Sequence, residues 1–190
     1  MDREKRIVGI QGEVGSFSEE AALDLLGQDT VIHNFRSFEA VFESFKNRDI
    51  DHCVIPMENS LLGSIHRNYD LLLKNKAIIQ GEIYLKITHN LIVIPGTRFE
   101  DIKTVISHPV ALDQCGKFFD RFPDLRIETS YDTSGSVKEM MQSNRKDLAA
   151  IAGRRAADAF GGELLMESIQ DHEENYTRFV LLGDSFLYTP

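Results

Sequence analysis

The sequence predicts an α/β protein made of two lobes. Short apolar, β-branched runs alternate with segments of helical periodicity from one end of the chain to the other, which is typical of strands that alternate with helices. The alternation starts again near His89, and no Gly/Ser-rich linker marks the joint. The 190 residues are enough for two small lobes with their own cores. We therefore expect lobes at 1–86 with 177–190 and at 87–176, with strands crossing between them and helices on both faces of parallel sheets.

In the first half of the chain, glycines and capping residues delimit the elements. Ile7–Gln11 is an apolar run that ends at Gly12, and the capping-box spacing of Ser16 and Glu19 predicts that a helix follows. Apolar residues at i, i+3, i+4 and i+7 make Ser37–Lys46 an amphipathic helix. The other expected elements are strands at Val31–Phe35, His52–Pro56 and Ile78–Leu85 and a helix at Arg67–Lys74.

The second half repeats this pattern. Pro109 follows the short strand Thr104–Ser107 and predicts the start of a helix, whose apolar side runs to Phe122 before Pro123 ends it. The other expected elements are strands at Leu91–Ile94, around Ile127, Leu148–Ala152, Leu164–Ile169 and Thr177–Gly183, and helices at Ser134–Gln142 and Arg154–Phe160.

Composition excludes several classes of function. A net charge of −9 argues against general nucleic-acid binding, and no apolar run is long enough to cross a bilayer. The first six residues carry charges of both signs and no apolar signal core, so we expect a cytoplasmic protein. Cys53 and Cys115 lie in apolar stretches, as reduced and buried thiols do. The six histidines lack the HExxH spacing, so no metal site is expected.

Five polar segments that contain or adjoin glycine carry the candidate chemistry. They are Gly12–Ser18, Glu58–Ser64, Ser107–Gln114, Asp132–Ser136 and Asn175–Phe179. Each lies next to an expected strand, and ligands of open α/β sheets bind at the carboxyl ends of strands and at domain interfaces. Taken singly, each segment also fits an ordinary turn, a helix cap or the solvated start of a strand.

Two of these segments indicate how an acidic chain could bind an anion. The segment after Gly12 matches neither the dinucleotide fingerprint nor a P-loop, but the amides of a helix that begins there could bind a carboxylate. Thr177 and Arg178 offer a hydroxyl and a two-pronged cation to a carboxylate.

Taken in order, the segments resemble the prephenate dehydratase family over nearly the whole chain, from about Ile7 to Leu182. The matching pieces include Gly12-x-x-Gly15-Ser16-Phe17-Ser18, Glu58-Asn59-Ser60, Gly63-Ser64-Ile65, Ser107-His108-Pro109, Gln114-Cys115 and Ile169-Gln170-Asp171. The most specific piece is Asn175-x-Thr177-Arg178-Phe179, which is similar to the family's Thr-Arg-Phe signature. The stretch from Gly63 to Leu73 looks especially like plant arogenate dehydratases and their bacterial relatives.

The resemblance implies a fold similar to the type II periplasmic binding proteins, with the active site in the cleft between the lobes. It implies a hydro-lyase that converts prephenate to phenylpyruvate in phenylalanine biosynthesis, without a cofactor or a metal. Arogenate as substrate is the alternative, and a non-catalytic module that binds a small acid is the alternative from another class. Many family members continue into a regulatory ACT domain, which these 190 residues do not include. The expected partner is the small-molecule substrate, and the oligomeric state stays open, with a homodimer among the states allowed.

The resemblance also assigns roles to individual residues. We expect Thr177, Arg178 and Glu58 to be catalytic, with Thr177 assisting departure of the hydroxyl group. Arg178 either binds the side-chain carboxylate of the substrate or only braces the loop, and Glu58 is either a proton donor or a structural acceptor. The expected substrate-binding residues are Asn59, Ser60, Gly63, Ser64, Ser107, Gln114, Thr133 and Phe179.

Overall fold

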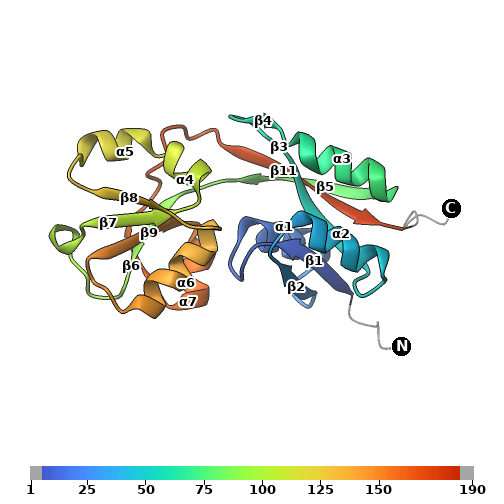
Figure 1. Ribbon diagram of the computed structural model, residues 1–190, viewed down its shortest axis with the longest axis horizontal. Coiled ribbons are helices and arrows are strands. Elements are labelled where there is room, and N and C mark those ends of the chain that lie inside the picture. Colours follow the sequence, from blue (N-terminus) through green and yellow to red (C-terminus); the bar gives the residue numbers. More distant parts are fainter. Residues whose placement is uncertain (1–5, 185–190) are drawn as a thin grey trace. The chain divides into compact units, whose positions relative to one another are not determined.

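The computed structural model describes residues 6–184 and divides into two compact units (Figure 1). The first unit consists of the described residues up to Gly12, of Phe17–Lys86 and of the residues from Asn175 onward. The second consists of Glu13–Ser16 and Ile87–Glu174. The predicted lobe limits within 1–5 and 185–190 lie outside the described residues.

Two short segments do not belong to the unit that the predicted lobe limits give them. Glu13–Ser16 belongs to the second unit, because the carboxylate of its first residue pairs with Lys138 at 3.0 Å. Asn175 and Tyr176 belong to the first unit, because Asn175 accepts a hydrogen bond from Asn59 and Tyr176 already lies in a strand of the first sheet. Both differences arise from long-range contacts, which local sequence patterns do not report.

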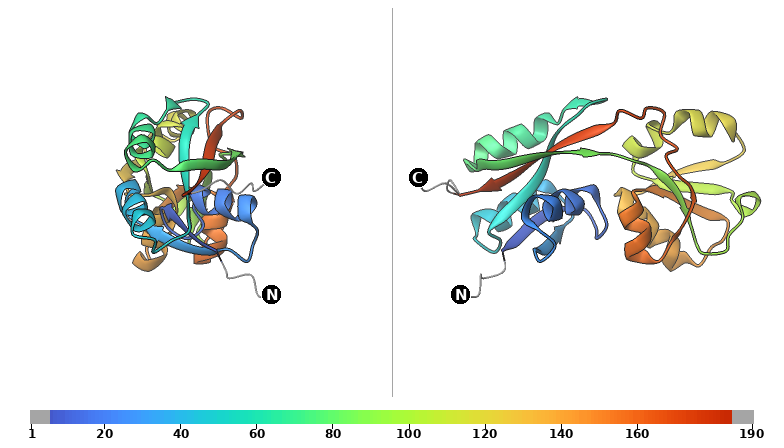
Figure 2. Two further views of the ribbon diagram at one scale, coloured as in Figure 1. Left: turned by 90° about the vertical axis from the view of Figure 1, so that its right-hand side faces the viewer. Right: turned by 180° about the vertical axis from the view of Figure 1, so that it is seen from behind.

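A mixed sheet forms the centre of the first unit. Its strands are β1 (Ile7–Gln11), β2 (Val31–Phe35), β3 (His52–Asn59), β4 (Gly63–Ser64), β5 (Ile78–Lys86) and β11 (Tyr176–Gly183). The order is β2-β1-β3-β11-β5, and β4 forms a hairpin with the end of β3. β1 is parallel to β2 and β3, whereas β11 is antiparallel to β3 and β5. Figure 2 shows β11 lying along β5.

Three helices cover this sheet: α1 (Phe17–Leu26), α2 (Phe38–Lys46) and α3 (His66–Asn75). The Ser37 hydroxyl caps α2 by accepting a hydrogen bond from the Ala40 amide, and Gly27 follows α1 with a φ of +98°. The apolar side of α2 buries Val41 and Phe42 against β3 and β11, so the predicted amphipathic stripe is confirmed.

A second mixed sheet forms the centre of the second unit. Its strands are β6 (Asn90–Val93), β7 (Thr104–Ser107), β8 (Arg126–Thr129), β9 (Leu148–Ala152) and β10 (Glu163–Met166), in the order β10-β6-β9-β7-β8. Its helices are α4 (Pro109–Asp113), α5 (Gly116–Arg121), α6 (Thr133–Ser143) and α7 (Arg154–Phe160), with a 3-10 turn at Phe99–Asp101. Alternate residues of β7 and β9 point into two separate cores, one with α4 and α5 and one with α6 and α7. Helices therefore cover both faces, as predicted.

The prediction of parallel sheets was wrong for part of each sheet, because both sheets are mixed. In the first sheet, β11 follows the second unit in sequence, enters between β3 and β5, and runs antiparallel to both. In the second sheet, β6 and β10 run antiparallel to their neighbours. Alternation of strands and helices predicts parallel crossovers within one sheet, but it does not predict the direction of strands that connect two units.

The single helix expected after Pro109 is two helices. Gln114 caps α4, and α5 starts anew at Gly116. The break is held by Asp171, whose amide donates to the Gln114 carbonyl at 2.7 Å and whose carboxylate accepts from the Lys117 amide at 2.9 Å. Apolar spacing continues across the break, so periodicity alone predicts one helix.

No helix in the described part of the chain is long and apolar enough to span a membrane.

Candidate active site

The amino end of β11 aligns the predicted catalytic residues with the end of β3. Thr177 pairs with Asn59, and Arg178 pairs with Glu58. Beyond this point the register shifts so that Phe179 pairs with Pro56, which leaves Met57 without a partner on β11. Such a bulge turns the following residues of a strand to the opposite faces. It therefore brings the Asn59 side chain to the same face as Thr177.

Thr177 lies in a buried network of amides. The residue is 8% exposed, as is Asn59, and Asn175 is fully buried. The Asn59 amide nitrogen Nδ2 lies 3.0 Å from Thr177 Oγ1, 2.8 Å from Asn175 Oδ1 and 3.2 Å from the Tyr176 carbonyl oxygen. Two segments that are neighbours only in the fold, the end of β3 and the residues around the start of β11, thus hold the threonine hydroxyl.

The orientation of the Asn59 amide follows from its backbone partners. Oδ1 accepts hydrogen bonds from the amides of Leu61 and Leu62, at 3.0 and 3.2 Å. Nδ2 faces the Tyr176 carbonyl, which can only accept. Exchanging the two amide atoms would set the NH₂ group against two N–H donors and the oxygen against a carbonyl. Nδ2 must therefore donate to Thr177 Oγ1.

The opposite face of the strands carries the charged residues. Arg178 contacts Glu82 through Nη2 at 2.7 Å and Nε at 2.9 Å, and its Nη1 lies 3.5 Å from Glu58. The hydrogen bond to Glu82 raises the pKa of Arg178. Glu58 also accepts from the Tyr69 hydroxyl at 2.6 Å, and this bond raises the tyrosine's pKa. Thr177 and Arg178 are neighbours in sequence, but their side chains lie on different faces of the sheet.

A small pocket of about 230 Å³ lies beside this charged face within the first unit. Its lining residues are Glu58, Asn59, Ser60, Gly63, Ser64, Tyr84, Tyr176 and Arg178. Six of the residues predicted from sequence are therefore brought together here, while Thr177 does not line it. Ser60 Oγ accepts from the Tyr176 amide at 2.9 Å, so this side chain also ties the β3–β4 hairpin to β11.

The residues predicted in the second unit gather around the carboxyl ends of β7 and β8. The Ser107 hydroxyl is fully buried and donates to the Ile151 carbonyl at 2.6 Å, so it ties β7 to β9. Gln114 is half-buried, with Oε1 2.9 Å from Nε2 of His89. Burial lowers the pKa of this histidine, against the effect of the Gln114 bond. Thr133 is the half-buried first residue of α6.

The amino end of α6 is capped by its own chain. Asp132 Oδ1 accepts from the Gly135 amide at 2.7 Å, which confirms helix capping for this segment. Burial raises the pKa of Asp132, although the amide bonds oppose the shift. The Ser134 hydroxyl donates to the Val14 carbonyl and so joins α6 to the segment after Gly12. Of the second-unit residues, Gln114 and Thr133 have the half-buried side chains that a ligand could contact.

Glu13 and Gly15 fix the glycine-bearing segment against the helices of the second unit. Glu13 accepts from the Tyr131 hydroxyl at 2.9 Å and pairs with Lys138. Gly15 has a φ of +77°, and a Cβ there would lie 2.7 Å from Cα of Ala156 in α7. The segment therefore needs glycine for its backbone conformation and for close packing.

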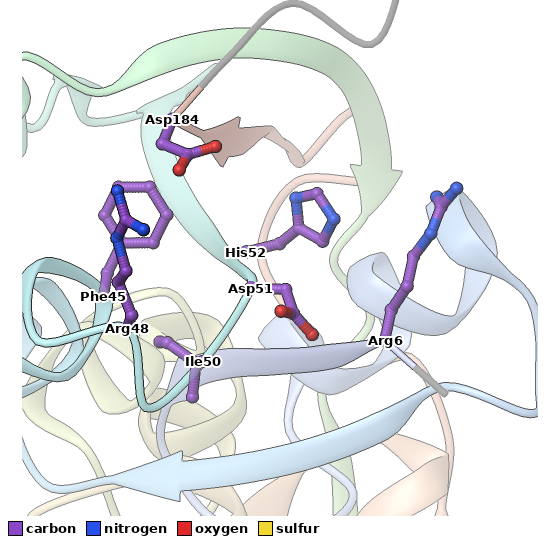
Figure 3. A pocket seen from close by; sticks show the side chains of 7 residues that line it. All are labelled: Arg6, Phe45, Arg48, Ile50, Asp51, His52 and Asp184. Carbon is purple, nitrogen blue, oxygen red and sulfur yellow. The ribbon is translucent and has the colours of Figure 1, made fainter. Parts of the chain in front are cut away.

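A larger pocket of about 430 Å³ lies elsewhere in the first unit, at the start of β3 (Figure 3). Its lining residues are Arg6, Phe45, Arg48, Ile50, Asp51, His52 and Asp184. Two arginines and two aspartates balance its charge, and burial lowers the pKa of His52. It lies at the opposite end of β3 from Asn59, and no residue predicted for catalysis or binding lines it. We therefore do not take this pocket as the active site.

The remaining predicted residues have structural surroundings. Phe179 is buried in β11, and His108 Nδ1 accepts from the Val110 amide and so caps α4. Cys53 and Cys115 are unpaired and buried, and burial raises the pKa of both thiols to about 12. Neither thiol has the lowered pKa of a nucleophile.

Sequence reasoning did not single out Asn175 and Tyr69 as site residues. Asn175 holds Asn59, and Tyr69 holds Glu58. Asn175 had a sequence signal, because it is the first residue of the most specific motif. Tyr69 lies within the stretch from Gly63 to Leu73 that resembles plant arogenate dehydratases, but no pattern indicated its contact with Glu58. The two residues are eleven positions apart and meet because α3 packs on β3.

Comparison with known proteins agrees with the fold and with the predicted family. A family model described as prephenate dehydratase matches residues 8–186. The chain is 41% identical to arogenate dehydratase/prephenate dehydratase 1, chloroplastic, of Arabidopsis thaliana, over 96% of this chain and 46% of that protein. It is 35% identical to the bifunctional chorismate mutase/prephenate dehydratase of Buchnera aphidicola, over 90% and 46%. The chain thus spans about half the length of these curated relatives.

Solved structures share the fold. The prephenate dehydratase of Arthrobacter aurescens, in complex with L-Phe, superposes with a TM-score of 0.87 at 24% identity, over 97% of this chain and 62% of that one. GqqA, described as a quorum quenching acylase, superposes with a TM-score of 0.85 at 26% identity, over 97% and 66%. The fold alone therefore does not decide the reaction. The family match extends over nearly the whole described chain, and the chain belongs to the prephenate dehydratase family.

Proposed function

We propose that this chain removes water and CO₂ from prephenate to give phenylpyruvate. Family membership supports the reaction, and one observation in this molecule carries it: Thr177 Oγ1 accepts a hydrogen bond from Asn59. No acceptor for the hydroxyl hydrogen of Thr177 occurs among residues 6–184. That hydrogen is therefore available to a bound ligand.

The reaction sets the requirements of the site. Prephenate is a dianion; it loses the ring carboxylate as CO₂ and the ring hydroxyl as water, and consumes one proton. The electron pair of the broken carbon–carboxylate bond completes the aromatic ring, and the ring carbon–oxygen bond breaks. Aromatisation supplies the driving force, so the enzyme must mainly hold the carboxylates and assist the departing hydroxide. General-acid assistance of this kind contributes about 10²–10⁴ in rate.

Thr177 is the proposed donor to the departing hydroxide. A threonine hydroxyl is a weak acid, so we propose a positioned hydrogen-bond donor and not a group that gives up its proton beforehand. Burial of Thr177 keeps bulk water from competing for the hydrogen bond. The Asn59 amide would strengthen this donation, because an oxygen that accepts a hydrogen bond donates its own more strongly.

Arg178 and Glu58 are proposed as a brace for the strand that carries Thr177. Arg178 is already bound to Glu82 and Glu58, on the other face of β11, which supports the bracing role over a grip on the substrate carboxylate. Glu58 accepts from Tyr69 and pairs with Arg178, which supports a structural acceptor over a proton donor. The ion pairs join β3, β5 and β11 at the level of Thr177.

Gln114 and Thr133 remain the proposed substrate-binding residues of the second unit. Both side chains are half-buried and can donate hydrogen bonds to carboxylate oxygens. Ser107 is proposed instead as a structural residue, since Ile151 takes its hydroxyl. Neutral donors of this kind let a chain of net charge −9 bind an anion locally.

Arogenate is the alternative substrate, since the curated Arabidopsis relative carries both names. It differs from prephenate by an amino group in place of the side-chain keto group, and it would give phenylalanine directly.

The names of the Arabidopsis relatives place those proteins in the chloroplast, whereas we propose the cytoplasm for this chain. Two unpaired, buried thiols are consistent with such a reducing compartment.

A paired turnover assay tests the proposal. The purified chain is given prephenate or arogenate, and phenylpyruvate and phenylalanine are measured. We expect turnover, with the higher kcat/KM for prephenate; a higher value for arogenate would reverse the choice of substrate. A folded chain that binds either acid without forming product would instead be a non-catalytic binding module.

A further inference from the structure

The Thr177 network contains a residue that does not touch the proposed donor but controls the group that does. Asn59 Nδ2 has two hydrogens and three acceptors within 3.2 Å. One hydrogen is used for Thr177 Oγ1, and the other is shared by Asn175 Oδ1 and the Tyr176 carbonyl. Of these contacts, the one to Asn175 is the shortest, at 2.8 Å.

We propose that Asn175 is a positioning residue for the reaction, because through Asn59 it directs the hydroxyl hydrogen of Thr177 toward the substrate. This inference rests on the proposed function of Thr177. Asn175 is fully buried and lies just before β11, two residues from Thr177. It is thus placed by the same strand that places the hydroxyl.

The physical reason is the direction of the hydrogen bond between Asn59 and Thr177. A threonine oxygen that accepts from Asn59 must send its own hydrogen elsewhere. If the Asn59 amide rotated so that its oxygen faced Thr177, the hydroxyl would donate to Asn59 and its hydrogen would turn away from the substrate. Asn175 opposes this rotation, because its oxygen would then face the Asn59 oxygen at hydrogen-bond distance.

The opposite end of the Asn59 amide is fixed in the same sense. Leu61 and Leu62 donate their backbone amides to Oδ1, and both residues belong to the turn between β3 and β4. These two donors alone leave Nδ2 with the more distant Tyr176 carbonyl at 3.2 Å as its remaining fixed acceptor. Without Asn175 the backbone partners would still favour this orientation but would hold it less firmly, so fewer molecules would keep the hydroxyl in the productive direction.

A double-mutant cycle tests this role. Asn175→Ala and Asn175→Ser are made in the wild-type chain and in Asn59→Ala, and kcat and KM for prephenate are measured for each. Serine keeps a polar group in the buried site but is too short to reach Asn59. We expect each change at Asn175 to lower kcat about tenfold with KM within about twofold, since positioning affects the reacting step. In Asn59→Ala the same changes should have no further effect on kcat.

Asn68→Ala is the matched control. Asn68 is a fully buried asparagine of the same unit whose Nδ2 donates to the Pro56 carbonyl at 2.7 Å, away from Thr177. Asn68→Ala should lower stability in urea without lowering kcat.

An unchanged kcat in the Asn175 variants, or an equal loss with and without Asn59, would overturn the inference while wild-type turnover upheld the proposed function. Loss of the folded state in both variants would make Asn175 a residue of the fold alone and also overturn it. Absence of wild-type turnover would contradict the proposed function and this inference with it.

Discussion

Asn59→Asp replaces the amide NH₂ group at the centre of the Thr177 network with a carboxylate oxygen while keeping the shape of the side chain. The oxygen that accepts from Leu61 and Leu62 is retained. The three contacts of Nδ2, at 2.8, 3.0 and 3.2 Å, become contacts between acceptors. Thr177 can then relieve its contact only by donating its own hydrogen inward.

The expected loss follows from these contacts. The inward turn of the hydroxyl removes its assistance to the departing hydroxide, so kcat should fall by about 10²–10⁴. The contact to Thr177 is reversed and not lost, so two hydrogen bonds, to Asn175 and to the Tyr176 carbonyl, are lost. At about 1 kcal/mol each, this lowers the free energy of unfolding by about 2 kcal/mol. Burial and the surrounding acceptors raise the pKa of the introduced carboxyl, and its protonated form can donate again. The ratio of variant to wild-type kcat should therefore rise as the pH falls.

The assay is kcat for prephenate against pH, with unfolding in urea followed in parallel. Asn68→Asp is the matched control, because it introduces a carboxyl at another buried asparagine that donates to a carbonyl but does not touch Thr177. It should be destabilised with kcat per folded molecule unchanged. Equal kcat in Asn59→Asp and in the wild type, at a pH where the carboxyl is ionised, would refute the assigned direction of the hydrogen bond.

Three further outcomes follow from the same structure. Arg178→Gln should lower kcat up to about tenfold with little change in KM if the arginine is a brace, and a KM raised more than about tenfold at constant kcat would make it the carboxylate grip. Gly15→Ala should lower the free energy of unfolding by about 3 kcal/mol, because a left-handed φ and a clash with α7 add together. Gly63→Ala, with a φ of +80° and open space around it, should lower it by about 1 kcal/mol. Equal losses in urea unfolding would show that the clash with α7 contributes nothing. Burial lowers the pKa of His52 below its ordinary 6.5, so the unfolded chain binds more protons at this residue than the folded chain does. The free energy of unfolding should therefore fall as the pH drops below 6.5. An equally steep fall in His52→Gln would show that other groups cause the pH dependence.

Much of the local structure could be predicted because it depends on patterns of residues that are close together in the sequence. Some apolar runs predicted the strands to the residue, as at Val31–Phe35 and Leu148–Ala152, and Ser37 marked the start of a helix. β3 runs three residues farther than predicted, and β10 ends three residues earlier. These signals depend on side chains within one turn or one strand. They need no knowledge of which segments meet.

The arrangement of strands and the split helix could not be predicted in this way. β11 lies between β3 and β5 although more than a hundred residues separate it from β3, so its direction is set by the fold. The break between α4 and α5 is held by Asp171, which follows β10 in the chain. The carboxylate and the Lys117 amide that it binds are 54 residues apart, and no local pattern reports such a bond.

The candidate site was predicted from the resemblance to a known family more than from geometry. The ordered motifs placed Glu58, Asn59 and Arg178 near Thr177, and the structure does bring these residues together at the ends of β3 and β11. A period of two would put Asn59 and Met57 on one face of β3. The bulge reverses this after Met57, so the partnership of Asn59 with Thr177, and the separation of Arg178 from it, became evident only in the structure.

The most direct test of the central claim compares Thr177→Val with Thr177→Ser. Valine keeps the branched shape of threonine and removes only the hydroxyl, whereas serine keeps the hydroxyl that Asn59 orients. With prephenate as substrate, we expect kcat to fall by about 10²–10⁴ in Thr177→Val and to stay within about tenfold of the wild type in Thr177→Ser. A folded Thr177→Val chain with the kcat of the wild type would contradict the claim that this hydroxyl carries the reaction.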